Sequence, residues 1–194
     1  MVSMEKFQYI KQKYGHYASW AVWAEEGVKP KDNIGDLTIF DTENNRSLLQ
    51  QLNPNLVFVG LNISRSIQFP LGNFHDSRPQ GMDFKIRYAF KGTPYWGGYM
   101  TDIIKDFEQK LAGKVTSYLR KNRAFERENV KTFQAELTDL EADNLTIIAF
   151  GNDAHSILKR NLGDKYPLVK IPHYSMYISK ERYKERVISI LGQI

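Results

Sequence analysis

The chain has 194 residues, of which 42% are hydrophobic, 13% aromatic and 25% charged, with a net charge of +5 and a sequence pI of about 9.2. It contains no cysteine, which excludes disulfides, thiolate zinc sites, iron–sulfur clusters and cysteine nucleophiles. No N-terminal apolar run has the form of a signal peptide, and no stretch reaches the length that spans a bilayer. We therefore expect a cytoplasmic protein without membrane contact.

Positive charge is concentrated in two segments of the C-terminal half. Residues 105–131 carry eight basic and four acidic residues, and residues 159–186 carry eight basic and three acidic residues. Two segments that converge on one face would attract phosphates, which favours a nucleic-acid partner. Two separate, solvated helix faces would only keep the protein soluble. The sequence leaves both interpretations open.

The N-terminal elements can be read from apolar spacing and turn residues. Apolar side chains spaced through residues 7–14 predict a helix that ends at Gly15. The segment Asp36–Asp41 has the pattern of a short strand. Leucines within residues 48–52 predict a helix that Pro54 ends, because proline cannot continue a helix.

The middle of the chain combines a buried strand with a long aromatic loop. The continuous apolar run Leu56–Leu61 predicts a strand buried on both faces, as in a parallel sheet covered by helices. Residues 63–95 show no clear periodicity but hold too many aromatic residues for disorder. Loops of such length are usually functional. A helix is expected over residues 103–111, and Asp102 is able to cap it.

Strands and helices alternate over the rest of the chain. The expected elements are a helix that begins near Asn129, a strand Leu145–Phe150, a helix capped by Asn152 or Asp153, a strand Leu168–Ile171 and a final helix capped by Ser179. This alternation predicts one α/β domain, a three-layer α/β/α sandwich with a mostly parallel sheet. Residues 1–45 are expected to form an extension packed on a core of residues 46–194.

Polar residues follow three of the expected strands. The three strand ends are Gly60-Leu61-Asn62, Thr101-Asp102 and Pro172-His173-Tyr174-Ser175. If the strands are parallel, these ends meet at the edge where open α/β sheets bind ligands. A glycine lets the backbone approach a ligand, and an amide offers both a donor and an acceptor. With the aromatic loop beside them, such residues suit a planar, polar ligand such as a nucleobase.

Five short motifs lie in the order seen in the uracil-DNA glycosylase superfamily. They are Gly60-Leu61-Asn62-Ile63-Ser64, Phe69-Pro70 with Asn73-Phe74-His75, Thr101-Asp102-Ile103-Ile104-Lys105, the segment 147–154, and His173-Tyr174-Ser175. They resemble, in turn, the Gly-Ile-Asn-Pro-Gly, Phe-Pro…Asn-Arg-Phe-Trp, Thr-Asn-Val-Val-Lys, Leu-Leu-Gly-x-x-Ala and His-Pro-Ser motifs of the mismatch-specific uracil/thymine branch. The chain therefore resembles a divergent member, and the first forty residues have no counterpart.

The resemblance implies a DNA N-glycosylase that hydrolyses the glycosidic bond of a base flipped out of the duplex, without a cofactor. Asn62 would position the water or the base, and His173 would donate to the departing base. Phe74 would stack on the base, and Gly60, Asp102 and Ser175 would contact the substrate. Arg65 would contact phosphate, while Tyr174, Met176 and Tyr177 lie where the family inserts a wedge into the duplex. No metal is expected, because His16, His75 and His155 show no ligand spacing.

The departures from the motifs bear on the ligand and on activity. Ile63 and Ser64 replace the Pro-Gly of the first motif, and Tyr174 replaces the proline of the last. Asp102 replaces a base-reading Asn. An ionised carboxylate only accepts hydrogen bonds, whereas uracil offers an acceptor at O4 and a donor at N3. A base edge rich in donors, such as an amino-bearing one, would suit Asp102 better, and we therefore hypothesise that uracil is not the preferred ligand. Two alternatives remain: a catalytically silent nucleic-acid- or nucleoside-binding protein, and a protein-interaction module or a protein acting on a small molecule.

Overall fold

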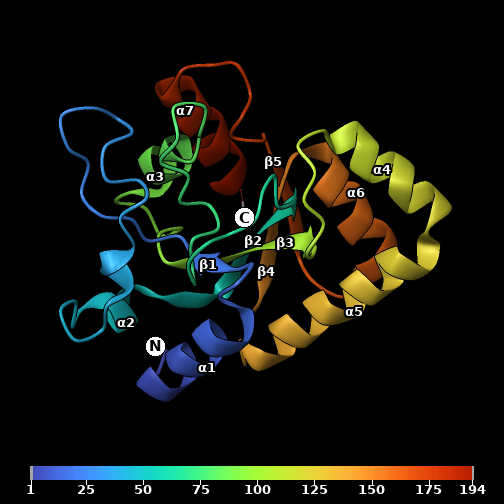
Figure 1. The fold of residues 1–194 in the computed structure, drawn as a ribbon, viewed down its shortest axis with the longest axis horizontal. Helices are drawn as coiled ribbons and strands as arrows, with labels where there is room; N and C mark the ends of the chain where they lie inside the picture. Colours follow the sequence, from blue (N-terminus) through green and yellow to red (C-terminus); the bar gives the residue numbers. More distant parts are fainter. Residues whose placement is uncertain (1, 194) are drawn as a thin grey trace.

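The computed structural model describes residues 2–193, which fold around a mostly parallel five-stranded sheet (Figure 1). The strand order is β1-β3-β2-β4-β5. The parallel strands are β3 (Gly98–Ile104), β2 (Asn53–Asn62), β4 (Thr146–Phe150) and β5 (Leu168–Ile171). The short strand β1 (Ser19–Trp20) pairs antiparallel with β3 at the edge. The α/β class expected from the sequence is confirmed.

Helices cover both faces of the sheet. One face packs against α1 (Met4–Tyr14), α4 (Ala112–Lys121), α5 (Arg123–Asp139) and α6 (Gly151–Leu162). The other packs against α3 (Phe84–Phe90) and α7 (Lys180–Leu191). The short helix α2 (Leu48–Gln51) leads into β2. None of the helices in residues 2–193 combines the length and the apolar character needed to cross a membrane.

Strand β2 lies at the centre of the sheet because its side chains are apolar on both faces. Val57 and Val59 belong to the core beneath α1, α5 and α6, whereas Phe58 belongs to the core beneath α3 and α7. Its neighbours are β3 on one side and β4 on the other. The chain thus continues from β2 to one side and later crosses to the other, which makes the carboxyl end of β2 a topological switch point.

Several sequence predictions are confirmed by the elements observed. The helix over residues 7–14, the strands around residues 56–61 and 145–150, and the strand 168–171 are all present. The Ser179 side chain accepts a hydrogen bond from the backbone N–H of Arg182, as expected of a helix cap.

Other predictions are wrong. Residues Leu37–Phe40 form a 3₁₀ helix (η1) rather than a strand, because the Asp36 carboxylate accepts from the backbone N–H and the hydroxyl of Thr38 and turns the chain. The helix expected over residues 103–111 is absent: β3 continues to Ile104 and a loop follows. Asp102 is therefore a strand residue and not a helix cap. Helices α3 and α4 were not predicted.

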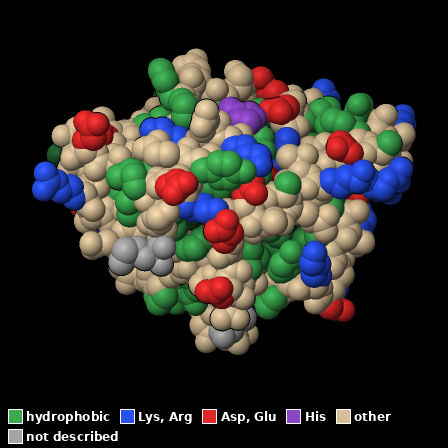
Figure 2. Space-filling view, turned by 90° about the horizontal axis from the view of Figure 1, so that it is seen from below, with side chains coloured by type: hydrophobic (Ala, Val, Ile, Leu, Met, Phe, Trp, Pro, Cys, Tyr) green, Lys and Arg blue, Asp and Glu red, His purple; other side chains and the backbone are tan. Residues whose placement is uncertain are grey.

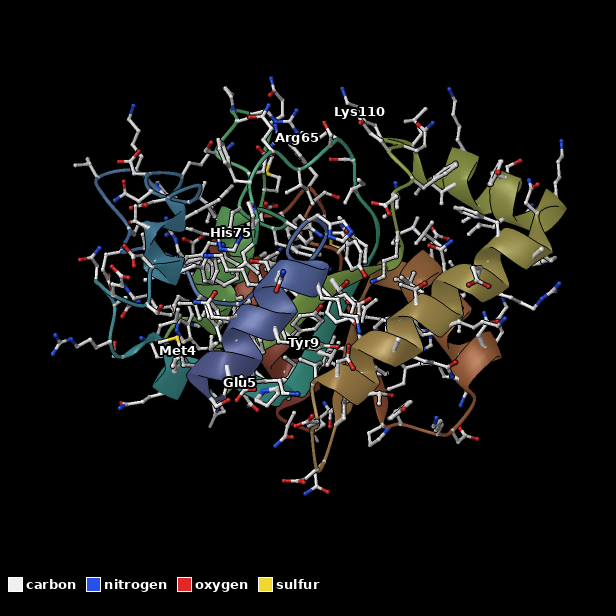
Figure 3. The ribbon with its side chains drawn as sticks, turned by 60° about the horizontal axis from the view of Figure 1, so that its bottom comes forward. Met4, Glu5, Tyr9, Arg65, His75 and Lys110 are labelled. Atoms are coloured by element: carbon white, nitrogen blue, oxygen red, sulfur yellow. The ribbon has the colours of Figure 1, made fainter. Side chains whose placement is uncertain are left out.

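The N-terminal helix is attached to the C-terminal end of α5 through Asp139. The Asp139 carboxylate accepts from the Tyr9 hydroxyl at 3.0 Å, the Tyr14 hydroxyl at 2.5 Å and the Lys13 ammonium at 2.7 Å. Figure 3 shows Tyr9 reaching from α1 toward this end of α5. The cation and the hydroxyl donors outweigh the burial that would raise the pKa of Asp139, so that its pKa is lowered. This contact fixes the N-terminal segment to the domain.

A buried ion pair joins β3 to α5 on the same face. Lys105 and Glu136, whose side chains are 5% and 0% exposed, form a salt bridge. The Tyr99 hydroxyl donates to the other Glu136 oxygen at 2.8 Å, and the Lys105 ammonium donates to the Thr101 hydroxyl at 2.6 Å. Burial lowers the pKa of Lys105, against the opposing charge of Glu136. The pair therefore depends on both partners remaining in place.

Candidate functional site at the carboxyl edge of the sheet

A carboxylate and an aromatic ring meet over Gly60 at the switch point. Gly60 in β2 lies opposite Asp102 in β3. A Cβ atom built on Gly60 would lie 2.2 Å from Asp102 Oδ1 and 3.3 Å from Phe74 Cζ. Glycine is thus the residue that lets the Asp102 carboxylate and the Phe74 ring share this space. The structure brings these three predicted site residues together.

Asp102 presents one unpaired carboxylate oxygen at this point. Its Oδ2 accepts from the Asn73 side-chain amide at 2.8 Å, whereas Oδ1 makes no hydrogen bond to any residue that the structure describes. The residue is only 4% exposed. Burial raises the pKa of Asp102 to about 6, although the Asn73 hydrogen bond and the Lys105 charge oppose the shift. At neutral pH the carboxylate is mostly ionised and only accepts hydrogen bonds.

The loop that carries Phe74 is held in a strained conformation. Phe74 has a φ of +62°, which is costly for a bulky residue. The Trp23 indole donates to the Phe74 carbonyl at 3.1 Å, and the Asn73 side chain accepts from the Phe74 N–H at 3.0 Å. The His75 ring lies with one nitrogen 2.9 Å from the Asn73 carbonyl and the other 3.0 Å from the Val22 carbonyl. These contacts hold the Phe74 ring over Gly60.

Aromatic rings close the space around Phe74. Its ring centroid lies 6.0 Å from that of Phe150 and 6.2 Å from that of Tyr174, and Phe74 is 4% exposed. Two hollows of about 410 and 380 Å³ lie elsewhere, one between the end of α6 and the start of β5 and the other beside α1. Neither of these hollows is lined by Asp102, Phe74 or Tyr174.

His173 is held as a neutral hydrogen-bond donor. The backbone N–H of Ser175 donates to His173 Nδ1 at 3.1 Å, and the Ser175 hydroxyl lies 2.8 Å from the same nitrogen. Because Nδ1 accepts, the neutral ring carries its proton on Nε2. Burial lowers the pKa of His173 to about 4. The His173 ring stacks on the Tyr174 ring with centroids 4.3 Å apart. Gly151 has a φ of +82°, and its missing side chain leaves room for the Cβ of His173.

Asn62 supports the loops around the site. Its amide nitrogen lies within hydrogen-bond distance of three backbone carbonyls, at 2.7 Å from Ile63, 2.9 Å from Phe107 and 2.8 Å from Gln109. An amide has two N–H donors, so these carbonyls use both. Asn62 thus links the segments that follow β2 and β3. Any contact with a water or a base would have to involve its Oδ1.

The residues predicted to contact nucleic acid lie on two loops at this end of the sheet. Met176 and Tyr177, between β5 and α7, are 38% and 103% exposed. Tyr174, on the same loop, is half-buried against Phe150. Arg65, on the loop after β2, bonds to Asp76 at 2.6 Å. Ser175 contacts His173 and therefore orients that ring.

Four residues of this region were given no role by the sequence: Asn73, Asp76, Arg78 and Asp83. Asp83 precedes α3 and is 5% exposed, and its carboxylate accepts from the backbone N–H of Asp76 at 2.7 Å. Burial raises the pKa of Asp83 to about 7, and the nearby charges of Asp76 and Asp102 act in the same direction. These four residues lie in a segment without periodicity, so no sequence pattern reveals their contacts.

This buried carboxyl gives a prediction for the pH dependence of stability. A pKa raised from about 4 in the unfolded chain means that the folded state holds the proton more tightly, so Asp83 favours folding most below about pH 4 and this contribution is lost as the pH rises to about 7. Over that range the native protein should lose up to about 4 kcal/mol of its free energy of unfolding through Asp83. We expect this loss to be absent in Asp83→Asn. Urea unfolding from pH 4 to 8 measures it.

Two features of this comparison isolate Asp83. Burial lowers the pKa of His75 and His173, which makes stability rise with pH, but both histidines are present in the two proteins and cancel in the difference. The introduced amide oxygen can still accept from the Asp76 N–H. Identical pH profiles for the two proteins would show that Asp83 does not titrate in this way.

Gly60→Ala should damage the site more than the sheet. The added methyl would lie 2.2 Å from Asp102 Oδ1, so the carboxylate would have to leave Asn73. We expect a destabilisation of about 1–3 kcal/mol in urea unfolding, as for other overpacked cores. The matched control is Gly113→Ala at an exposed position of α4, where a Cβ has nothing within 4 Å. That change should be neutral or stabilising. Equal effects at both positions would contradict the crowding at Gly60.

Comparisons with protein families, curated proteins and solved structures find no match for this chain. The class that the structure itself defines is an α/β protein with a polar and aromatic cluster at the carboxyl edge of a mostly parallel sheet. Within residues 2–193, no group of three or more His, Cys, Asp or Glu side chains is placed to hold a metal ion. The function must therefore be argued from the cluster.

Proposed function

We propose that the protein recognises a nucleobase, extruded from DNA or free, at the carboxyl edge of its sheet, on a scaffold of uracil-DNA glycosylase type. Helices on both faces support a three-layer sandwich of that kind. The observation that carries the proposal is the buried Asp102 carboxylate, whose Oδ1 has no hydrogen-bond partner among residues 2–193 and lies over a glycine. An acceptor in such a place is open to a donor on a ligand.

The chemistry of this acceptor favours a base with an amino group. The free oxygen can accept from an exocyclic N–H₂, but it offers no donor to a carbonyl such as O4 of uracil. Phe74 supplies an apolar ring beside the same oxygen, as stacking on a base requires. Uracil should consequently bind poorly.

Hydrolysis of the glycosidic bond is the second part of the proposal. The departing base gains negative charge, and a fixed donor at that charge lowers the barrier. His173, neutral at physiological pH with its proton on Nε2, is such a donor. Water activation by a carboxylate of the first motif is not available, because residues 60–64 contain none. The enzyme would therefore depend on stabilisation of the leaving base.

A catalytically silent protein is the second candidate, and Asn62 favours it. The amide donors that could position a water or a base are already bonded to loop carbonyls. Such a protein would bind DNA or a nucleoside without forming an abasic product.

A cleavage assay distinguishes these functions. Labelled oligonucleotides, single- and double-stranded, would carry uracil, hypoxanthine, xanthine, alkylated bases or amino-bearing bases, and abasic product would be measured. We expect cleavage of an amino-bearing base that falls at least about tenfold in Asp102→Asn. Lys165→Ala, an exposed change at the other edge of the sheet, is the control.

Each result of the assay has a definite meaning. Binding without product on any base would select the silent protein. Robust cleavage of uracil, lost in Asp102→Ala, would refute the preference for amino-bearing bases. Absence of both cleavage and DNA binding by the folded protein would leave a protein-interaction module.

A further inference from the structure

We propose that Arg65 and Arg78, held together by Asp76, form a binding site for a backbone phosphate of the nucleic-acid strand that delivers its base to Asp102. This inference rests on the proposed function. It assigns a ligand class, the phosphodiester, to a side-chain cluster beside the base site.

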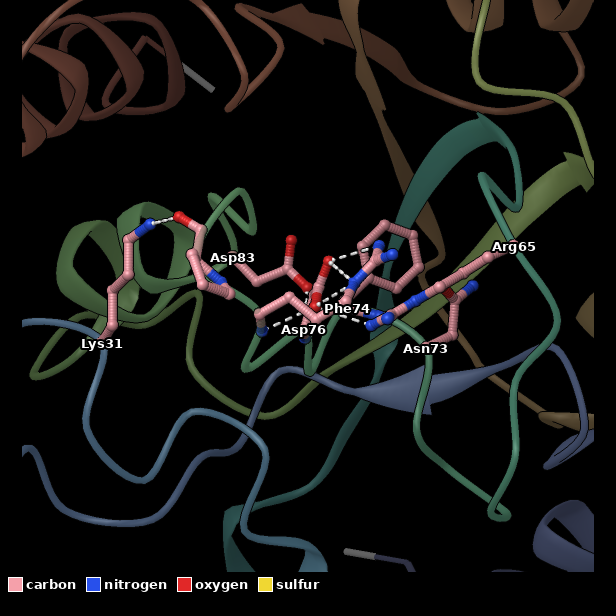
Figure 4. Close-up of polar contacts among 8 residues, drawn as sticks. Lys31, Arg65, Asn73, Phe74, Asp76 and Asp83 are labelled. Carbon is pink, nitrogen blue, oxygen red and sulfur yellow. Dashed lines mark hydrogen bonds and ion pairs between the residues drawn. The ribbon is translucent and has the colours of Figure 1, made fainter.

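The two arginines share one carboxylate. Arg65 Nη2 donates to Asp76 Oδ1 at 2.6 Å, and Arg78 donates to Oδ2 from Nη2 at 2.9 Å and from Nε at 3.3 Å (Figure 4). The backbone N–H of Arg78 also donates to Oδ1 at 2.9 Å. Burial alone would raise the pKa of Asp76, but the bonds from Arg78 and the charge of Arg65 lower it. Asp76 therefore stays ionised and fixes both guanidinium groups.

The cluster keeps both charge and donors for a ligand. Two guanidinium groups and one carboxylate leave one net positive charge. Arg65 Nε and Nη1 and Arg78 Nη1 make no hydrogen bond to the described part of the chain. The side chains of Arg65 and Arg78 are 36% and 40% exposed, against 18% for Asp76. Planar guanidinium groups with free N–H donors and fixed orientation suit a phosphate.

The cluster lies on the loop that shapes the base site. Asp76 follows Phe74 by two residues, and the Asp76 N–H bonds to Asp83. Arg65 follows the carboxyl end of β2, and Asp102 lies near the carboxyl end of the neighbouring strand β3, so both belong to the same end of the sheet. Figure 4 shows Phe74 and Asp76 on the same loop. A strand bound at the arginines would thus pass beside Phe74.

Neighbouring charges extend this surface along the same edge. The loops after β2 and β3 are joined by the Gln109 N–H, which donates to the Ile63 carbonyl at 3.2 Å. Figure 3 shows Lys110 and Arg65 extending from this edge. The Glu108 carboxylate, on the loop after β3, adds a negative charge to this edge and accepts from the Ser66 N–H at 3.0 Å. The face shown in Figure 2 mixes charges of both signs.

The experiment measures binding of a short, fluorescein-labelled single strand whose bases are all replaced by abasic analogues, so that only the backbone can bind. Fluorescence anisotropy over a range of salt concentrations gives the affinity and its salt slope. The variant Arg65→Ala/Arg78→Ala/Asp76→Asn removes the cluster with a net loss of one charge. The control is Lys165→Ala alone, which removes the same net charge from the opposite edge. We expect the cluster variant to bind about tenfold more weakly, with a salt slope smaller by about 0.7 for each phosphate that the variant no longer neutralises.

Asp76→Asn alone tests whether position matters beyond charge. It adds a positive charge, so a purely long-range attraction would strengthen binding. Our inference predicts weaker binding, because the arginines lose their common partner. Equal affinity and slope in the cluster and control variants, tighter binding by Asp76→Asn, or no binding of the strand by the native protein would each overturn the inference. If amino-bearing nucleosides still bound through Asp102, the proposed base recognition would stand without it.

Discussion

Replacing His173 with alanine is expected to lower the rate of base release by about 10²–10³-fold, the usual cost of removing a donor that stabilises a developing negative charge. The neutral ring donates from Nε2 because the Ser175 N–H occupies Nδ1. The pKa of His173 is near 4, so the rate should show no ionisation of this residue from about pH 6 to 8. Single-turnover cleavage, with excess enzyme, measures the chemical step.

Ser175→Ala is the matched control for His173→Ala. It removes the hydroxyl 2.8 Å from His173 Nδ1 but keeps the backbone N–H that fixes the tautomer. We expect a loss of less than about tenfold, since the donor on Nε2 remains. Equal losses of rate in the two variants would contradict the proposal that His173 donates to the departing base. A rate in His173→Ala close to that of the native protein would also contradict it.

Glu136→Gln is expected to cause the largest loss of stability. The change leaves the buried Lys105 ammonium without its counter-charge, and breaking a buried pair from one side costs about 3–5 kcal/mol. Because burial already lowers the pKa of Lys105, its ammonium should then lose the proton more easily, and the variant should gain stability as the pH rises. Urea unfolding at neutral and alkaline pH measures both effects.

The double variant Lys105→Met/Glu136→Leu provides the comparison. Replacing both members of a buried pair with apolar residues of similar size is often neutral or stabilising. We therefore expect the double variant to recover most of the stability lost in Glu136→Gln. A loss below about 1 kcal/mol in Glu136→Gln would show that the pair is less important than its burial indicates.

Three strands were predictable from sequence because most of their residues are apolar, although Lys170 in the third is exposed. Leu56–Leu61, Leu145–Phe150 and Leu168–Ile171 need no tertiary information to be recognised. The segment Asp36–Asp41 has the apolar spacing of a strand, but a local side-chain bond from Asp36 decides in favour of a 3₁₀ turn. The sequence places a helix after Asp102, because aspartate is a favoured helix cap, whereas β3 continues to Ile104. Here Asp102 is buried by Phe74 and Asn73, which come from elsewhere in the chain.

The candidate site was predictable only in part. The parallel sheet brings Gly60 and Asp102 together, as the expected topology requires. The Asn73 bond to Asp102 spans 29 residues, and the positive φ of Phe74 follows it in the chain; the sequence reveals neither feature. The sequence likewise does not reveal the bonds of Arg65 and Arg78 to Asp76. Asn62 was assigned to water or base, yet its donors bind the loop carbonyls, which no local pattern indicates.

The most direct test of base recognition is the affinity of cytidine, adenosine and uridine for the native protein and for Asp102→Asn, measured by isothermal titration calorimetry. In the variant the amide oxygen can keep accepting from Asn73, which leaves the NH₂ group facing Gly60 as a donor. We predict that the native protein binds the amino-bearing nucleosides at least about tenfold more tightly than uridine, and that the variant reverses this order. The same order of affinities in both proteins, or no binding of any nucleoside, would contradict recognition of a base by Asp102.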